Sequence, residues 1–273
     1  MAEEWVGRVR SAEDGLVARR LYQGRSFREA EQAAEAGRAQ FAILSAGLGL
    51  VPADAPIPAY SLTVASDAAD NVIARLEPAA NAVQWWRELR RTGLGSDIAA
   101  MAGDGLILLA AGRVYLEMLA ADLERLSRDD LQRVRVFTAA PARELPGIFA
   151  GIVMPYDDRL DGPDSGRAGT LSDFAQRAVH DFTINIAPRS PSGSVLEHSS
   201  AILERMKDWR RPQRSRGASF SDAEIRKVIV QHWQTVGGRS SAMLRFLRSD
   251  LGIACEQGRF RRLFNDLNAE RAA

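Results

Sequence analysis

Residues 104–137 contain an apolar stretch, a helical stretch and a second apolar stretch in succession. The first, residues 104–112, and the last, residues 133–137, have the length and aliphatic content of buried strands. Between them, residues 114–126 show the spacing of apolar side chains that is typical of an amphipathic helix. This order predicts two parallel strands joined by a helix that crosses one face. A parallel βαβ unit is therefore the expected centre of the fold.

Two more apolar runs predict further strands, at residues 40–46 and 152–154. The first ends in Gly47-Leu48-Gly49, which we interpret as the exit of a buried parallel strand. Together these runs predict an α/β fold, a three-layer domain with a mainly parallel sheet of at least four strands. The glycine pair lacks the third glycine of a dinucleotide-binding fingerprint, so no nicotinamide or flavin cofactor is expected.

The composition narrows the class of protein. The 273 residues are 46% hydrophobic and 26% charged, as in soluble globular proteins, and their number allows one or two domains. A single cysteine, Cys255, excludes an internal disulfide, and three scattered histidines lack metal-ligand spacing, so neither a metal nor a cofactor is expected. No window of 18 apolar residues is present and the first residues lack a signal-peptide pattern, which predicts a cytoplasmic protein without a membrane partner.

Charge is distributed unevenly along the chain. Residues 205–273 contain 15 basic and 7 acidic side chains, whereas residues 1–204 contain 21 basic and 28 acidic ones. A basic C-terminal quarter on an acidic body indicates a nucleic-acid partner, with an ordinary basic surface as the alternative.

The same C-terminal quarter predicts three short helices. Ser221 and Glu224 match a capping box, Gly237-Gly238 breaks the first helix, and a third helix is expected over residues 256–270. A tight turn between the second and third helices resembles a helix-turn-helix, although a protein-docking module would look similar. We expect DNA contacts from the arginines of the last helix and of the segment before the module, namely Arg210, Arg211, Arg214, Arg216, Arg259, Arg261 and Arg262.

These patterns divide the chain into three parts. Residues 1–186 are expected to form the α/β catalytic or base-binding domain, and residues 219–273 the three-helix DNA-binding module. Residues 187–218, rich in proline, serine, glycine and arginine around one helical patch, are expected to be a linker or bridging segment. No sequence feature specifies an oligomeric state.

The segment that follows residues 152–154 is the strongest candidate site. It contains Tyr156, Arg159 and four aspartates within ten residues, at the predicted carboxyl end of a strand, where α/β proteins place functional groups. Crowded carboxylates perturb one another, so we expect one of them to keep a proton near neutral pH. A solvated turn is the alternative explanation.

Residues 21–60 resemble a known family. Leu21-Tyr22, Ser26-Phe27, residues 43–46, Gly49-Leu50, Pro58 and Tyr60 match the LY…F…LSAxxGL…PYD pattern of a little-studied bacterial α/β family, distantly related to YaaA-type peroxide-stress proteins. The segment YDDRLDG at residues 156–162 also fits. The family usually begins with a strand that carries Cys and Lys, which are missing here, and its PYD is replaced by Ala59-Tyr60-Ser61. Roles of the missing groups are not carried over.

The resemblance implies an activity on modified DNA. Relatives occur beside DNA base-modification and phage-defence genes, and the chain is similar to phage-defence DNA glycosylases that remove glucosylated hydroxymethylcytosine. We therefore expect a metal-independent glycosylase that flips a modified base out of double-stranded DNA and leaves an abasic site. Asp157 or Asp158 would be catalytic and stabilise the oxocarbenium-like sugar. The implied substrate-binding residues are Ser45 and Tyr60 on the base, Asp161, Asp164 and Asp173 on the sugar hydroxyls, and Arg159, which would orient the partner carboxylate or bind a phosphate. Tyr156 is expected to bind substrate as well.

Two other functions share most of these features. A non-catalytic regulatory protein that binds DNA or a modified base would need everything except a reactive carboxylate. A nuclease could hold magnesium at the four-aspartate loop, but the sequence has no second acidic cluster with an adjacent lysine, and its two lysines, Lys207 and Lys227, lie outside the α/β region.

Overall fold

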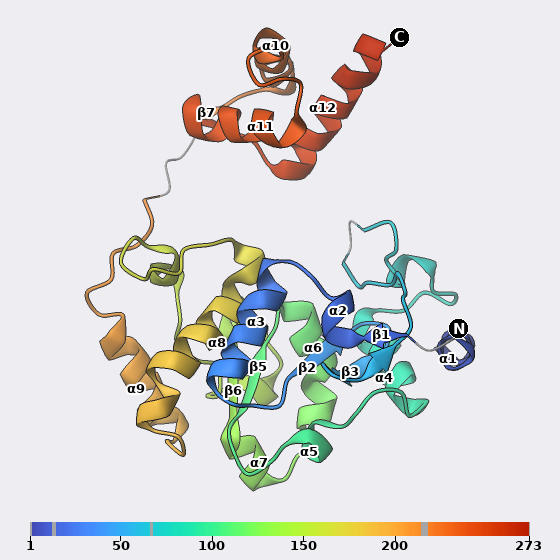
Figure 1. The fold of residues 1–273 in the computed structure, drawn as a ribbon, viewed down its shortest axis with the longest axis vertical. Coiled ribbons are helices and arrows are strands. Elements are labelled where there is room, and N and C mark those ends of the chain that lie inside the picture. Colours follow the sequence, from blue (N-terminus) through green and yellow to red (C-terminus); the bar gives the residue numbers. More distant parts are fainter. Residues whose placement is uncertain (1, 13–14, 66–67, 214–217, 273) are drawn as a thin grey trace. The chain divides into compact units, whose positions relative to one another are not determined.

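The computed structural model describes residues 2–12, 15–65, 68–213 and 218–272, which form two compact units that meet in sequence between Pro212 and Gln213. Figure 1 shows the elements of each unit. Residues 187–212, expected to be part of a linker, belong to the first unit. They contain the helix α9 (Val195–Arg205), whose Ile202 is completely buried.

The first unit is not the expected three-layer domain. The structure is about 52% helical and 11% strand, and its named strands pair only in two-stranded sheets. The prediction of a mainly parallel sheet is therefore wrong. Each apolar run supplies at most four strand residues, because a glycine turn or a helix start follows directly; β5 (Ile107–Ala110), for example, ends two residues before Gly112 begins the next helix.

The predicted βαβ unit is present at a smaller size. β5 pairs in parallel with β6 (Val134–Phe137), and α6 (Arg113–Leu123) and α7 (Arg128–Arg133) connect them (Figure 1). The expected strand at residues 152–154 contributes a single parallel bridge, between Val153 and Val136. The order of apolar runs thus gave the local topology correctly and the extent of the sheet wrongly.

Residues 42–52 form an antiparallel hairpin, so the prediction of a parallel strand here is also wrong. β2 (Ala42–Ser45) pairs with β3 (Gly49–Pro52). The Ser45 hydroxyl accepts hydrogen bonds from the backbone N–H groups of Gly47 and Leu48, at 3.2 and 3.0 Å, which stabilises the turn. Gly49 has φ +79°, and a Cβ there would lie 2.9 Å from the Leu94 carbonyl oxygen. These glycines close a hairpin.

The other elements of the first unit are mostly helical. Residues 72–92 are divided at Pro78, which cannot donate a helical hydrogen bond, into the 3₁₀ turn Ile73–Arg75 and α4. The remaining bounds are α1 (Ala2–Ser11), β1 (Leu16–Val17) paired with β4 (Pro56–Ile57), α2 (Ala18–Leu21), α3 (Arg25–Ala36), α4 (Ala82–Arg91), α5 (Ile98–Met101) and α8 (Phe174–Asn185).

Apolar side chains of this unit form separate clusters around its helices. One cluster lies between α4 and α6 and includes Trp85 and Leu116. Another contains Phe137, Met154 and Phe182, on β6, the following loop and α8. α3 packs beside α8 (Figure 1).

A buried histidine links α9 to β6. Arg135 donates from Nε to Nδ1 of His198 at 2.9 Å, so the other ring nitrogen, Nε2, carries the proton and donates to the Ser190 carbonyl at 2.8 Å. His198 is completely buried. Burial, and then the nearby charge of Arg135, lower its pKa below the ordinary 6.5.

Lowering the pH should therefore reduce the free energy of unfolding of the first unit within a defined pH range. Because the pKa of folded His198 is lower than that of the unfolded chain, its stabilising contribution is complete above pH 6.5 and is lost as the pH falls through the lower, folded value. Thermal unfolding measured from neutral pH to about pH 5 should show this loss. In His198→Gln the melting temperature should depend less on pH over this range. An unchanged pH dependence would contradict the assignment of the stability loss to His198.

The second unit contains the three predicted helices: α10 (Asp222–His232), α11 (Ser240–Arg245), which continues as a π-helical turn to Asp250, and α12 (Gln257–Ala272). Ser221 and Glu224 form the predicted capping box. β7 (Ala218–Ser219) and β8 (Ile253–Ala254) pair in parallel. The apolar core consists of Ile225, Ile229, Met243, Leu247, Phe260, Leu263, Phe264 and Leu267, among others.

Candidate functional site

The loop after Met154 is shaped by one of its own aspartates. Asp157 precedes a 3₁₀ turn at Asp158–Asp161, and its Oδ1 accepts from both the backbone N and the Nε of Arg159, at 3.0 and 2.9 Å. Arg159 in turn donates to the Met206 carbonyl at 2.9 Å. The loop is thereby fastened to the chain that follows α9.

Two arginines from that chain complete the site. Arg211 contacts Asp157 at 3.1 Å and also pairs with Asp158, while Arg210 pairs with Asp164 at 2.6 Å. The structure thus brings together residues that the sequence predicted separately as catalytic, substrate-binding and DNA-binding. We call this group the aspartate–arginine cluster: Asp157, Asp158, Arg159, Asp164, Arg210 and Arg211.

The cluster depends on a close backbone approach at Gly162. A Cβ at this position would lie 1.8 Å from the Arg210 carbonyl oxygen, so only glycine fits while that chain is in place. Gly162→Ala should displace Arg210 and Arg211 from their carboxylates and lower the thermal stability of the first unit by about 1–3 kcal/mol. The measurement is thermal unfolding, with Gly103→Ala, where a Cβ meets nothing within 4 Å, as the matched control. Equal stability of the two variants would contradict this packing.

The carboxylates of Asp157 and Asp164 are ionised at neutral pH. Partial burial alone would raise the pKa of Asp157, but the hydrogen bonds from Arg159 and the charges of Arg159 and Arg211 outweigh it and lower that pKa. The hydrogen bonds from Arg210 lower the pKa of Asp164 to about 2. The expected proton near neutral pH is therefore wrong for these two groups, because each has an arginine rather than a second carboxylate as its nearest charged neighbour.

Two other predicted sugar-binding residues share one buried arginine. Asp161 and Asp173 both pair with Arg177, at 2.8 and 2.7 Å, and the Arg177 side chain is completely buried. Burial would raise the pKa of Asp173, but the hydrogen bond and charge of Arg177 are among the groups that lower it. These contacts fix the start of α8, and Asp173, 4% exposed, is not positioned to meet a substrate.

Tyr156 is also an internal residue. Its hydroxyl donates to Asp181 at 2.9 Å, and Arg205 pairs with the same carboxylate at 2.9 Å. Burial, then the charge of Asp181, raise the pKa of Tyr156. The sequence analysis missed Asp181 and Arg177, although Asp173, Arg177 and Asp181 recur every four residues and so lie on one face of α8.

Ser45 and Tyr60, predicted to contact a flipped base, do lie together. Their hydroxyls are hydrogen-bonded, and that of Tyr22 lies 2.5 Å from that of Tyr60. Burial raises the pKa of Tyr60, which keeps its hydroxyl protonated. Ser45 is only 2% exposed and its oxygen is occupied by the hairpin turn, so of this pair only Tyr60 retains accessible surface.

The predicted DNA-binding residues of the second unit differ in whether they form ion pairs within the protein. Arg259 and Arg262 both pair with Asp222, at 2.6 and 3.1 Å, and so connect α12 to α10. Arg261 has no ion pair among the described residues. Lys227, Arg239 and Arg245, which the sequence analysis did not select, are in the same situation within the described part of this unit. Arg214 and Arg216 lie outside the described residues.

No family model, curated protein or solved structure matches this chain. The family resemblance of residues 21–60 therefore rests on the sequence pattern alone. The activity that it implies remains a prediction.

Two more observations concern ligands and surroundings. Within the described ranges, no three His, Cys, Asp or Glu side chains are placed to hold a metal ion. The helices formed by those same residues include none that combines the length and the apolar character needed to span a bilayer.

Proposed function

We propose that this protein is a DNA glycosylase that hydrolyses the bond between deoxyribose and a modified base in phage DNA, with glucosylated hydroxymethylcytosine as the suspected base. The observation that supports this best is the aspartate–arginine cluster. It places carboxylates, which can stabilise a sugar that becomes positively charged, next to exposed arginines that can bind the phosphates of the same nucleotide.

Within the cluster, Asp158 is the better candidate for the reacting carboxylate. Asp157 is occupied by the backbone and side chain of Arg159, whereas the one ion pair of Asp158 among the described residues is with Arg211. Asp158 is also 36% exposed. In the proposed reaction the base leaves with the bonding electrons, and Asp158 stabilises the resulting charge on the sugar. Water then adds to C1′ and loses one proton to Asp158 or Asp157, from which the proton passes to the departed base.

Arg210 and Arg211 bind the DNA backbone in this proposal. Both side chains are mostly exposed, at 73% and 61%, and a guanidinium can exchange a carboxylate for a phosphate with the same two-pronged geometry. When Arg211 moves to a phosphate, Asp158 becomes free to face the sugar. The ion pairs present without DNA thus hold the carboxylates in place until substrate arrives.

The second unit supplies affinity. Several of its cations, Arg261, Lys227, Arg239 and Arg245 among them, have no ion-pair partner in the described ranges and are available for phosphates. Such binding is largely independent of sequence and weakens steeply with salt.

The test separates excision from binding. The full chain is incubated, in the presence of EDTA, with unmodified duplex DNA and with phage DNA that carries glucosylated hydroxymethylcytosine, and alkali-labile sites and DNA retention are both measured. We expect alkali-labile sites only in the modified DNA. Cleaved phosphodiesters in a parallel reaction with Mg²⁺ and without EDTA, absent when EDTA is added, would indicate a nuclease and contradict the proposal.

A non-catalytic regulatory protein that binds DNA or a modified base is the second candidate. The observation in its favour is that Asp157 and Asp158 both pair with arginine, because such pairs fasten the loop even in a protein without catalytic activity. Tight retention of modified DNA without abasic sites would support this function over the glycosylase.

A further inference from the structure

A pocket of about 770 Å³ lies in the first unit among α4, α5 and α6, at residues that the proposed glycosylase does not use. Four arginines line it, Arg87, Arg90, Arg91 and Arg125, against two aspartates, Asp97 and Asp122. Its size is within the range of roughly 300–1,000 Å³ that is typical of small-molecule sites. The excess of cations indicates an anionic ligand.

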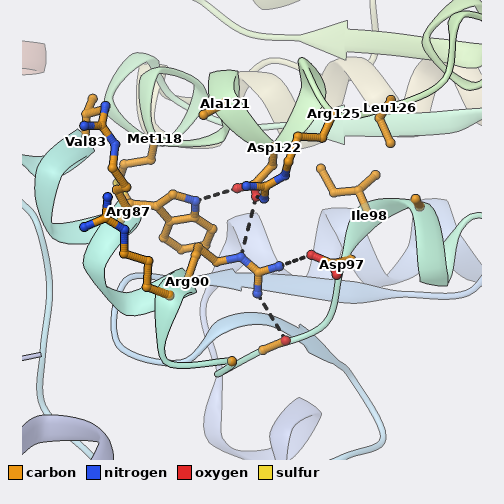
Figure 2. Close-up of a pocket in the computed structure, with 15 residues that line it drawn as sticks. Val83, Arg87, Arg90, Asp97, Ile98, Met118, Ala121, Asp122, Arg125 and Leu126 are labelled. Carbon is orange, nitrogen blue, oxygen red and sulfur yellow. Dashed lines mark hydrogen bonds and ion pairs between the residues drawn. The ribbon is translucent and has the colours of Figure 1, made fainter. Parts of the chain in front are cut away.

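The aspartates of the pocket are already neutralised by internal contacts. Asp122, 8% exposed, accepts from the indole nitrogen of Trp86 at 2.6 Å and pairs with Arg90 and Arg125. Asp97 pairs with Arg90 as well. Figure 2 shows Arg90 between Asp97 and Asp122, where it holds the wall of the pocket together.

Arg91 pairs with Glu88 at 2.7 Å. Arg87 and Arg125 are then left to attract a ligand. Arg87 is exposed and has no carboxylate within ion-pair distance among the described residues of the chain. Arg125 is 62% exposed although it touches Asp122. Both side chains border the pocket in Figure 2. An exposed guanidinium beside a concave surface is the group that proteins use most for phosphates.

Apolar side chains complete the pocket. Val83, Ile98 and Leu126 belong to its lining, together with the buried indole of Trp86. A ligand that fits must therefore carry an uncharged, partly apolar body as well as its anionic group. The extended backbone of DNA offers phosphates but no such compact body for a concave site.

We propose that this pocket binds a nucleoside phosphate, with its phosphate at Arg87 and Arg125 and its base or sugar against the apolar wall. This inference does not depend on the proposed glycosylase activity, and either can fail without the other.

Calorimetric titration of the full chain tests the assignment. The probes are the four nucleoside 5′-monophosphates, their uncharged nucleosides and a short duplex DNA. We expect at least one monophosphate to bind at millimolar concentration or below, its nucleoside to bind at least about tenfold more weakly, and high salt to weaken binding.

Variants locate the site. Arg87→Ala should weaken the binding of the monophosphate by about tenfold or more, and so should the double variant with Arg125→Ala. Arg87→Ala breaks no internal ion pair of the described residues. The control Arg143→Ala, an arginine 83% exposed outside the pocket, should not. Absence of binding by every monophosphate, or equal binding by all variants, would overturn the proposal. So would weaker duplex binding by the Arg87 variants without any nucleotide binding, because the arginines would then belong to a DNA surface.

Discussion

Asp158→Asn should lower the rate of base excision by at least about a hundredfold and leave DNA retention nearly unchanged. The amide keeps the shape of the side chain but removes the negative charge that would stabilise the oxocarbenium-like sugar. Asp158 accepts no hydrogen bond from the described backbone that would fix the loop, so the fold should tolerate the change. Release of the base in a single turnover, measured beside DNA retention, gives both quantities.

Asp157→Asn and Asp104→Asn are the comparisons for this variant. Asp157 caps the 3₁₀ turn and anchors Arg159, so its amide should reduce excision and also lower the melting temperature. Asp104 is exposed in the loop before β5, and Asp104→Asn should behave as the native chain. If Asp158→Asn retains full activity while native protein excises the base, Asp158 is not the reacting group.

Arg177→Met should destabilise the first unit by about 3–5 kcal/mol at neutral pH. Methionine has a similar volume but leaves the carboxylates of Asp161 and Asp173 without their buried partner. For a chain of this size the melting temperature should fall by about 10 °C. Arg143→Ala, which changes an arginine at the surface, should shift stability by less than about 0.5 kcal/mol.

The same variant has a pH signature. The pKa of folded Asp173 lies below its ordinary 3.8, so in the native chain the pairing with Arg177 stabilises the fold above this value and is lost as the pH falls through the folded pKa. The difference between native chain and Arg177→Met should therefore shrink below about pH 4. A constant difference at all pH values would show that lost packing, and not the unpaired carboxylates, causes the destabilisation.

The sequence predicted local elements better than the sheet. The helical spacing at residues 114–126 and the capping box at Ser221 depend only on neighbouring residues, and both appear in the structure. The pairing of residues 42–45 depends on where the chain returns, which Ser45 and Gly49 decide through a hairpin turn. A pattern of apolar runs does not distinguish that return from a crossover to a parallel strand.

The sequence likewise predicted the part of the candidate site that depends on neighbouring residues and missed the part that depends on distant ones. The aspartate-rich loop was visible in the sequence, but its arginines come from residues 210 and 211, about fifty positions away. Crowded carboxylates alone suggest a raised pKa, whereas Arg159, and after it the distant Arg211, lower the pKa of Asp157 although burial would raise it. Asp181 was missed because a buried acid on a helix looks, in sequence, like part of a solvated face.

The most direct measurement is mass spectrometry of the bases released when the full chain acts on phage DNA with glucosylated hydroxymethylcytosine, in the presence of EDTA. The glycosylase proposal predicts free glucosylated hydroxymethylcytosine, one abasic site for each base released, and no release from unmodified DNA. Retention of the modified DNA with no free base would contradict the proposal and leave a DNA-binding protein without excision activity.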